Sequence, residues 1–351
     1  MIRIAVMGVG AIGGSLGGFM AQAGEDVTFI DPWRDSVETM KSRGLQLGGS
    51  TGDHTVLVNV IHTDDLHSLK GTFDIVLIAV KSYDTPWATN LMLPYMRDDT
   101  WVVSPQNGIN ELQIAPIVGA ARMVGCVTTI SAGMMEAADV SRTDSTSQGL
   151  ASKPVCFKVG ELDGSTTARV ERLAELFEPA GHAVVTNDLW GERWTKMGLN
   201  CIANPSSAMT HMPSYDMRAH DGARKMMLKF GAEAIRVGRA LGYNVASPIG
   251  NFTLEDIEKA AYGDNPELEA AFVGQPQKFP GWPSMAQDVI KGRKTEIDYL
   301  NGYVAQEGRR IGIPTPYNDA AVAVIKGIEA GEFHPGVDNV DRVNSMVRAN
   351  Q

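Results

Sequence analysis

Lys196, Asn200 and Asn204 recur at intervals of four residues within the segment 189–205. Residues four apart lie on the same face of a helix, so this spacing predicts three polar side chains stacked on an otherwise apolar helix. Polar groups in apolar surroundings are costly unless they are paired or used. A desolvated lysine has a lowered pKa, which suits it to donate a proton to a developing alkoxide. The alternative interpretation is a lysine that reaches solvent beside two capping or core amides.

Two further polar groups follow strand-like runs. Lys81 comes after the apolar run 74–80, and Asn107, which precedes Gly108, comes after the run 100–104. Ligands of open α/β sheets bind outside the carboxyl ends of the strands, so both side chains are candidates for contacts with a cofactor or a substrate. Taken alone, Asn107 is by default an ordinary Asn-Gly turn residue, and Lys81 is likewise consistent with a solvated lysine.

Ser284 and Glu296 lie twelve residues apart in a third polar segment, within a stretch of helical periodicity over residues 284–311. Twelve residues are about three and a third turns, so a continuous helix would leave the two side chains rotated from one face. Charged residues in such a segment usually form a solvated surface.

The elements that position these groups begin with a glycine pattern. Gly8, Gly10 and Gly13 follow the apolar run 2–7 and open into a helical stretch. The first glycine permits a tight turn, the second lets the backbone approach a pyrophosphate, and the third lets the helix pack on the strand. The N–H groups of Ala11, Ile12 and Gly13 at the helix start would then face the anion. This context predicts a dinucleotide site.

Asp31 ends the next apolar run, about 20 residues beyond the glycines, where a carboxylate accepts hydrogen bonds from ribose hydroxyls. A carboxylate at this position repels a 2′-phosphate, so NAD is favoured over NADP. Arg34 keeps NADP open as an alternative, because a guanidinium three residues later can bind a 2′-phosphate.

Composition excludes several classes of protein. The 351 residues carry 41 acidic and 31 basic side chains, a net charge of −10, which argues against nucleic acid as a partner. Three cysteines without C-x-x-C spacing indicate a reducing compartment, and the histidines show no metal-ligand spacing. We expect no metal, no membrane segment and a cytoplasmic location.

The order of the runs predicts the architecture. Up to about residue 187, β-type runs alternate with helical patterns, which predicts a Rossmann-type domain of class α/β over residues 1–187, with a parallel sheet covered on both faces. Residues 188–351 predict an all-helical domain, with periodic stretches at 196–203, 222–240, 284–311 and 318–330. Residues 139–152, rich in Ser and Thr, predict a loop. An apolar run of Met226, Met227, Leu228 and Phe230 suggests a homodimer contact, although such residues more often form core.

These motifs, in this order, resemble the ketopantoate reductase (2-dehydropantoate 2-reductase) family over nearly the whole chain. The residues that carry the resemblance are the glycine pattern, Gln106-Asn107-Gly108, Lys196 with Asn200 and Asn204, Ser284-Met285, and the segment from Thr295-Glu296 to Asn301-Gly302. The resemblance implies a Rossmann domain plus an all-helical domain, with the site in the cleft.

The resemblance also implies roles. Lys196 looks like the general acid that protonates the carbonyl oxygen, and Glu296 like its partner carboxylate near the substrate hydroxyl. The remaining implied contacts to substrate and cofactor are Asn107, Asn200, Asn204 and Ser284, with Lys81 near the nicotinamide end.

Two positions depart from the family pattern. Asp31 stands where the family, which usually prefers NADP, often carries a basic or small polar residue. Gly281-Trp282-Pro283 precedes Ser284 where the family commonly has an Asn that holds the substrate, which favours a 2-oxo acid other than ketopantoate.

The leading hypothesis is an NAD(P)-dependent oxidoreductase that transfers hydride between nicotinamide and a small 2-oxo or 2-hydroxy acid. The alternatives are an NAD-dependent dehydrogenase of a different alcohol or ketone in a catabolic pathway, a related hydroxy-acid or opine dehydrogenase, and a dinucleotide-binding sensor without turnover.

Overall fold

In the computed structural model, which describes residues 2–143, 154–247, 249–275 and 281–349, the first apolar run forms strand β1 (Arg3–Met7). Its alternate side chains enter two separate cores. Ile4 and Val6 lie in one cluster, whereas Ala5 and Met7 lie in the other. A strand buried on both faces has no polar side, which explains why this run reads as continuously apolar.

The chain divides into two compact units, Met1–Leu189 and Trp190–Gln351. The helices of the N-terminal unit are α1 (Ala11–Gln22), α2 (Arg34–Arg43), α3 (Thr85–Met92), α4 (Glu111–Val118) and α5 (Ala168–Phe177), and its short 3₁₀ helices are η1 (Thr63–Ser68), η2 (Ser82–Asp84), η3 (Leu93–Tyr95), η4 (Ala120–Arg122) and η5 (Glu178–Ala180). Its other strands are β2 (Asp26–Asp31), β3 (Leu45–Gly49), β4 (His54–Val56), β5 (Asn59–His62), β6 (Phe73–Ile78), β7 (Met96–Ser104), β8 (Met123–Thr128), β9 (Ala132–Glu136), β10 (Asp139–Arg142), β11 (Phe157–Glu161) and β12 (Ala183–Val185).

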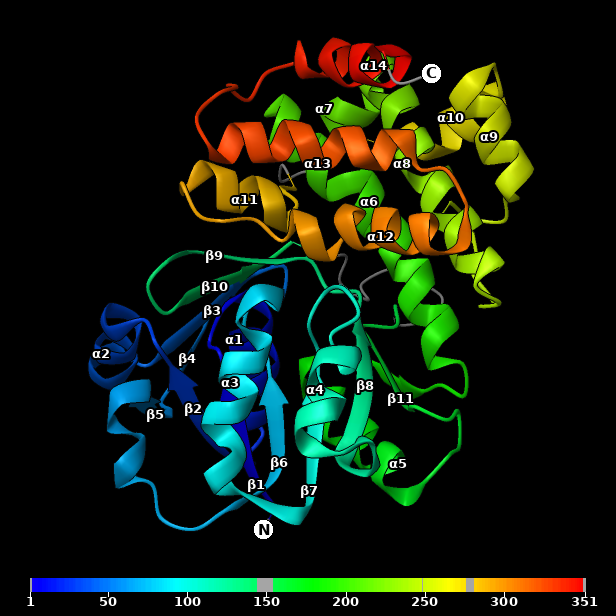
Figure 1. Cartoon of the computed structure of the whole chain (residues 1–351). Coiled ribbons are helices and arrows are strands. Elements are labelled where there is room, and N and C mark those ends of the chain that lie inside the picture. The colour runs from blue at the N-terminus through cyan, green and yellow to red at the C-terminus, as the bar shows by residue number, and fades with distance from the viewer. Residues whose placement is uncertain (1, 144–153, 248, 276–280, 350–351) are drawn as a thin grey trace. The chain divides into compact units, whose positions relative to one another are not determined.

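Eight of these strands form one sheet in the order β12-β11-β8-β7-β6-β1-β2-β5 (Figure 1). The six strands from β8 to β5 pair in parallel, and their order is that of a dinucleotide-binding Rossmann sheet. β11 pairs antiparallel with β8 and parallel with β12. The predicted α/β class is confirmed, with one antiparallel pairing that a wholly parallel sheet does not have.

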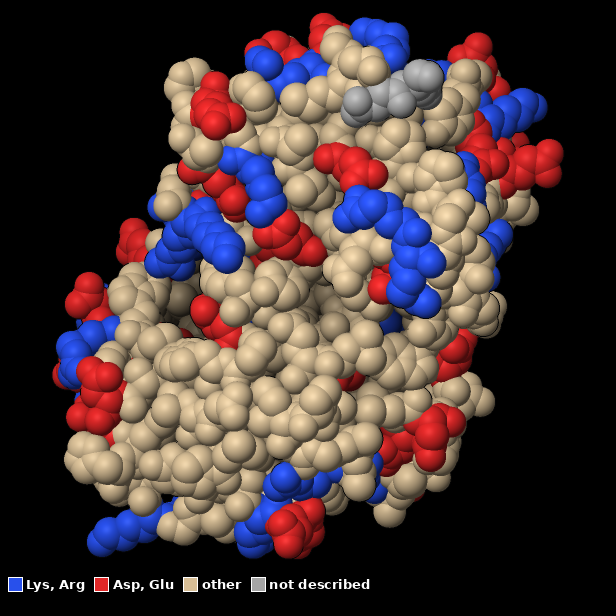
Figure 2. Space-filling model, in the orientation of Figure 1, with Lys and Arg blue, Asp and Glu red and all other residues tan. Residues whose placement is uncertain are grey.

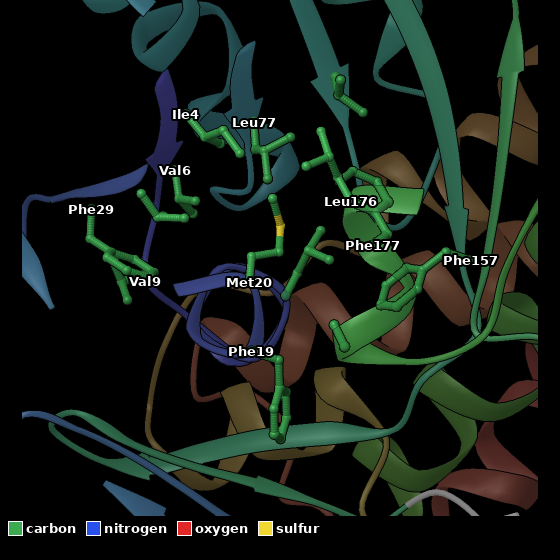
Figure 3. Close-up of a cluster of buried hydrophobic side chains, with 14 of the residues drawn as sticks. Ile4, Val6, Val9, Phe19, Met20, Phe29, Leu77, Phe157, Leu176 and Phe177 are labelled. Carbon is green, nitrogen blue, oxygen red and sulfur yellow. The ribbon is translucent and has the colours of Figure 1, made fainter. Parts of the chain in front are cut away.

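Helices cover both faces of this sheet. The larger core joins α1 and α5 to the sheet through residues such as Met20, Phe29, Phe157 and Phe177 (Figure 3). The second core packs α3 and α4 on the opposite face of β1 and β6. The sheet is therefore held rigidly between two helical layers, and its strand ends have fixed positions.

A second sheet of four strands, in the order β4-β3-β10-β9, packs against α1. The predicted loop over residues 139–152 is wrong at its start, because Asp139–Arg142 forms β10, which pairs with β3 and β9. A short strand of alternating polar residues has little apolar signal, so the run of Ser and Thr concealed it. Residues 144–152 of that prediction lie outside the described residues.

The outer surface of α3 and α4 carries no charged side chain in the view of Figure 2. Pro86, Trp87, Leu112 and Pro116 are exposed there, with Trp87 at 45% and Leu112 at 54%. The acidic groups that give the chain its net charge are therefore distributed elsewhere on the surface.

The C-terminal unit is built of helices. They are α6 (Leu189–Thr210), α7 (Ser214–Ala219), α8 (Asp221–Ala240), α9 (Leu254–Tyr262), α10 (Pro266–Val273), α11 (Ser284–Ile290), α12 (Asn301–Ile311), α13 (Pro316–Glu329) and α14 (Asn339–Ala349), with the 3₁₀ turn η6 (Ile297–Tyr299). The predicted helical domain is confirmed. Within the described residues, no helix is long and apolar enough to span a membrane.

Two expectations for this unit are corrected. The periodic stretch 284–311 is not one helix, because α11 ends at Ile290, Gly292 takes a φ of +61°, and α12 starts at Asn301. The run from Met226 to Phe230 is buried inside the unit, so it is not available to a second copy of the chain.

Helices α6 and α8 pack closely because α8 presents glycines to α6. A Cβ on Gly231 would lie 2.6 Å from Ile202, and a Cβ on Gly238 would lie 2.8 Å from Trp194. Residues two apart on a helix differ by about 200° in direction. Lys196 therefore points away from the side of α6 that Trp194 presents to α8.

Candidate functional site

The turn between β1 and α1 has the geometry that its glycines predict. Gly8 has a φ of +98°, and a Cβ there would lie 2.7 Å from the Val80 nitrogen. A Cβ on Gly13 would lie 2.0 Å from the Gly8 carbonyl oxygen. Both positions require glycine because the surrounding backbone leaves no room for a side chain.

Gly10 differs from these two glycines. A Cβ at this position would meet no protein atom within 4 Å, and as the N-cap of α1 the residue offers no side chain to the helix start. The first hydrogen bond of α1 runs from the Gly14 N–H to the Gly10 carbonyl (2.8 Å). The N–H groups of Ala11, Ile12 and Gly13 precede it and have no intrahelical acceptor. The turn thus leaves space beside three donors at the positive end of a helix, which fits a pyrophosphate.

Asp31 is the last residue of β2 and is buried. Its Oδ2 accepts a hydrogen bond from the Val9 N–H (2.5 Å), and its Oδ1 accepts one from the Trp33 N–H (2.7 Å). The carboxylate therefore holds the glycine turn in place. Each carboxylate oxygen can accept more than one hydrogen bond, so a contact to a ribose remains compatible with these two.

A polar network fixes the loops that carry Lys81 and Asn107. The Gln106 amide nitrogen donates to the Val80 carbonyl (2.7 Å) and to Thr85 Oγ1 (2.8 Å). The Asn110 amide donates to the Asn107 carbonyl (2.7 Å). Gly108, with a φ of +84°, turns the chain between them. The backbone of both predicted contact residues is thus held at the ends of β6 and β7.

Lys196 lies on α6 with its ammonium group removed from water. This burial lowers the pKa of Lys196 to about 8. Within the described residues, no carboxylate forms an ion pair with the ammonium that would oppose the effect of burial. The lysine is therefore a stronger proton donor than one in water.

The next two turns of α6 join Lys196 to α11. The Asn204 amide nitrogen donates to Asn200 Oδ1 (3.4 Å), and Asn204 Oδ1 accepts hydrogen bonds from Ser284 Oγ (3.0 Å) and the Met285 N–H (3.2 Å). The structure thus brings Asn200, Asn204 and Ser284 together. It also gives Asn204 a second task, because its oxygen satisfies the first turn of α11.

Glu296 is buried just before η6 and does not form an ion pair with Lys196. Its segment is held by its neighbours. The Thr295 N–H donates to Glu329 Oε1 (2.7 Å), and Lys326 pairs with Asp298 (2.7 Å). A role for Glu296 as partner of Lys196 therefore remains a prediction.

Asn301 also anchors this segment, and sequence reasoning did not single it out. Pro205 has no N–H to donate to the Cys201 carbonyl, so that acceptor within α6 lacks its helical partner. The Asn301 amide donates to this carbonyl (3.3 Å) and to Asn318 Oδ1 (2.9 Å). The proline inside α6 is therefore the sequence signal for this contact, because it leaves the Cys201 carbonyl to be bound by a donor from outside the helix.

Trp282 packs on His211, with ring centroids 5.5 Å apart. His211 follows the end of α6, seven residues beyond Asn204, which corresponds to about 10 Å along a helix. The Ser214 hydroxyl donates to the Gly281 carbonyl, and the Gln287 amide donates to the Trp282 carbonyl (both 2.8 Å). The indole therefore borders the far end of α6 and does not lie beside Lys196.

Within the described residues, no group of three or more His, Cys, Asp or Glu side chains is arranged so that it could hold a metal ion. The chemistry that these residues offer is proton donation, hydrogen bonding and anion binding.

Family models match most of the chain. One described as "Ketopantoate reductase PanE/ApbA" matches residues 4–151, and one described as "Ketopantoate reductase PanE/ApbA C terminal" matches residues 188–329.

Individual relatives match over nearly their full lengths. A 2-dehydropantoate 2-reductase of Pyrococcus horikoshii is 28% identical over 331 residues, which cover 94% of this chain and 98% of the relative. A protein of the same name from Mesorhizobium japonicum is 28% identical over 342 residues, with coverages of 93% and 97%.

Solved structures show the same fold. A PanE/ApbA family ketopantoate reductase from Ralstonia eutropha has a TM-score of 0.73 at 27% identity, with coverages of 95% and 100%. A D-mandelate dehydrogenase with NADH and anilino(oxo)acetate has a TM-score of 0.77 at 21% identity, with coverages of 94% and 99%. The second likeness concerns the fold alone.

Proposed function

The chain belongs to the ketopantoate reductase family of oxidoreductases that act on CH–OH groups, and from this premise we propose that it reduces a small 2-oxo acid to the 2-hydroxy acid with NADH. The observation that carries the proposal is Lys196, a lysine with a pKa lowered to about 8 on the same helix face as two amides. A pure dinucleotide sensor has no need of such an acid.

The N-terminal unit would hold the cofactor. The N–H groups of Ala11, Ile12 and Gly13 would bind the pyrophosphate beside Gly8 and Gly10, while Asp31 would accept from the adenosine ribose. Lys81 and Asn107, at the ends of β6 and β7, would contact its nicotinamide end. A bound nicotinamide supplies the hydride that reduces the ketone carbon.

Lys196 would act as the general acid. As negative charge develops on the carbonyl oxygen, the ammonium group donates a proton to it, and in the reverse direction the neutral amine removes the hydroxyl proton. A pKa near 8 supports both roles near neutral pH. Donors aimed at a developing oxyanion are commonly a large part of the rate gain.

The substrate would be bound by five polar side chains: Asn200, Asn204, Ser284, Glu296 and Asn107. Asn200, Asn204 and Ser284 form one hydrogen-bonded group, so they would act as a unit in positioning the carboxylate or hydroxyl groups. Trp282 packs on His211 beyond this group, so its ring leaves room near Lys196 and would limit the length of the substrate at the far end of α6.

A second function is a dehydrogenase of a different hydroxy acid or ketone. The exchange of the family's Asn for Gly281-Trp282-Pro283 before Ser284 favours it, because an amide that holds the substrate is missing there. Both functions use the same Lys196 chemistry and differ only in the group beside Ser284.

The test is absorbance at 340 nm with NADH and with NADPH against ketopantoate and a panel of other 2-oxo acids, and with NAD and hydroxy acids in reverse. We expect turnover with NADH preferred, and kcat/KM for reduction falling as pH rises above about 8, where Lys196 loses its proton. Turnover of another 2-oxo acid but not of ketopantoate would select the second function. No turnover with any acid would contradict both.

A further inference from the structure

Arg34, His62 and Asp64 meet where β2 and β5 end. Asp31 and His62, the last residues of these two strands, are register partners, and Arg34 begins α2 three residues after Asp31. Arg34 Nη2 donates to His62 Nδ1 (3.0 Å) and to Asp64 Oδ2 (2.8 Å). This group therefore lies at the same strand ends as Asp31, the acid to which the adenosine ribose is assigned.

His62 is the buried centre of the group. Its Nε2–H donates to the Pro32 carbonyl (3.0 Å), which can only accept, so the proton lies on Nε2. Nδ1 is then an acceptor, and it receives the Asp64 N–H (3.1 Å) as well as Arg34. The histidine thus ties the turn after β2 to the turn after β5 and fixes the place at which Arg34 meets Asp64.

The pairing decides what Arg34 offers to a ligand. A guanidinium binds a phosphate strongly when its fork is available for two parallel hydrogen bonds. Here one arm is already bound to the Asp64 carboxylate and the His62 nitrogen. A 2′-phosphate would therefore meet an occupied cation and two carboxylates, Asp31 and Asp64.

We propose that Asp64, together with His62, holds Arg34 away from the 2′ position of the adenosine and so makes the site select NAD over NADP. The inference rests on the proposed dinucleotide function and names the residues outside the glycine turn that set its selectivity. Asp31 supplies the acceptor for a free 2′-hydroxyl, and Asp64 occupies Nη2 of the neighbouring guanidinium, which would otherwise be available to bind a phosphate.

The test is titration calorimetry of the full chain with 5′-ADP and with 2′,5′-ADP, which measures binding without turnover. Asp64→Ala removes the ion pair of Arg34 and leaves only its hydrogen bond to the His62 nitrogen. We expect the dissociation constant of 2′,5′-ADP to fall about tenfold while that of 5′-ADP changes less than about twofold. Asp65→Ala is the matched control. Within the described residues the Asp65 side chain makes no hydrogen bond or ion pair, so this variant removes an adjacent charge without releasing Arg34.

Arg34→Gln combined with Asp64→Ala completes the design. We expect this pair of changes to abolish the gain in 2′,5′-ADP affinity. An equal gain in Asp65→Ala would overturn the inference in favour of general charge repulsion, and so would no gain in Asp64→Ala. Wild-type protein that binds neither nucleotide would contradict the proposed dinucleotide function itself, and a wild type that prefers 2′,5′-ADP would contradict its NAD preference.

Discussion

The turn after β1 and the face of α6 that carries Lys196, Asn200 and Asn204 serve the proposed function by different means. The turn acts through backbone N–H groups, because three of its residues, Gly8, Gly10 and Gly13, have no side chain beyond a hydrogen atom. The helix face acts through the side chains themselves, Lys196, Asn200 and Asn204. A substitution in the turn acts by filling space or, at Gly8, by straining a backbone with positive φ, whereas one on α6 removes a reacting or binding group.

The two regions also differ in what supports them. The turn is stabilised by Asp31, whose carboxylate accepts a hydrogen bond from the N–H of Val9, 22 residues earlier in the chain. The α6 face depends on partners from far along the chain, because Ser284 and Asn301 reach it from 80 and 100 residues away. Both regions therefore depend on contacts formed by folding, and the partners of α6 come from farther along the chain than Asp31 does for the turn.

The largest expected effect is that of Lys196→Met, which removes the proposed proton donor on α6 and leaves the glycine turn unchanged. We expect kcat to fall by roughly 10²- to 10⁴-fold, the usual contribution of a general acid, with 5′-ADP binding unchanged. Stability should rise. The folded pKa of about 8 lies below the ordinary 10.5, so burying the charged amine costs about 3 kcal/mol at pH 7, and this cost fades between about pH 8 and 10.5.

Initial rates and chemical denaturation of both proteins at pH 7 and pH 10 check this prediction. Lys196→Arg is the control, since it keeps a cation that hardly releases its proton. A Met variant with wild-type turnover would exclude proton donation by Lys196, and a variant with unchanged stability would exclude burial as the cause of the lowered pKa.

The second prediction compares two glycines of the turn. Gly13→Ala places a Cβ 2.0 Å from the Gly8 carbonyl oxygen, so we expect lost stability of roughly 1–3 kcal/mol or more together with lost binding. Gly10→Ala meets no protein atom, so its unfolding midpoint should match the wild type. Because the backbone at Gly10 must approach the pyrophosphate, we expect its 5′-ADP affinity to fall about tenfold or more. If Gly10→Ala binds 5′-ADP with wild-type affinity, the proposal that the pyrophosphate lies against this turn is contradicted.

The same contrast explains how much could be predicted from the sequence. The Rossmann-type sheet and the helical second half follow from local periodicity, and the glycine turn follows from the strand and helix that flank it. β10 and the break after Ile290 did not follow, because a polar strand and a glycine at φ +61° depend on pairing and tertiary support. Periodicity does not report either of these.

The candidate site divides in the same way. The spacing of Lys196, Asn200 and Asn204 is a helical pattern, so it could be found from the sequence. That Asn204 binds the start of α11, and that Asn301 replaces the missing donor of Pro205, depends on residues brought together only by folding. His62 ends the short strand β5 and Asp64 follows it, and their position at its carboxyl end was the signal available for them.

The third prediction tests the support behind α6. Glu233, on α8, accepts hydrogen bonds from the Tyr317 N–H, the Asn318 N–H and the Asn318 amide. Burial raises the pKa of Glu233 to about 7 despite these bonds. The folded state therefore binds this proton more tightly than the unfolded chain, and its stabilising effect is lost as pH rises from about 4.5 to about 7.

Glu233→Gln has no proton to lose at this position. We expect the unfolding free energy of the wild type to fall relative to that of the variant by up to about 3 kcal/mol between pH 4.5 and pH 7.5. Urea denaturation across this range measures the difference. A constant difference between the two proteins would mean that folding does not raise the pKa of Glu233, which would contradict the prediction.

The smallest effect is expected for Ser284→Ala, which asks whether a residue on the α6 side can serve both structure and binding. The change removes the hydroxyl that donates to Asn204 Oδ1 but leaves the Met285 N–H on the same oxygen, so stability should fall by only about 1 kcal/mol. If Ser284 also contacts the substrate, KM rises by up to about tenfold while kcat is kept, because the reacting groups are untouched. Steady-state kinetics and urea denaturation of Ser284→Ala, with Ser284→Thr restoring the hydroxyl, separate the two tasks. If stability falls but KM is unchanged, Ser284 only stabilises α11. The substrate would then be contacted on the helix face by Asn200 and Lys196.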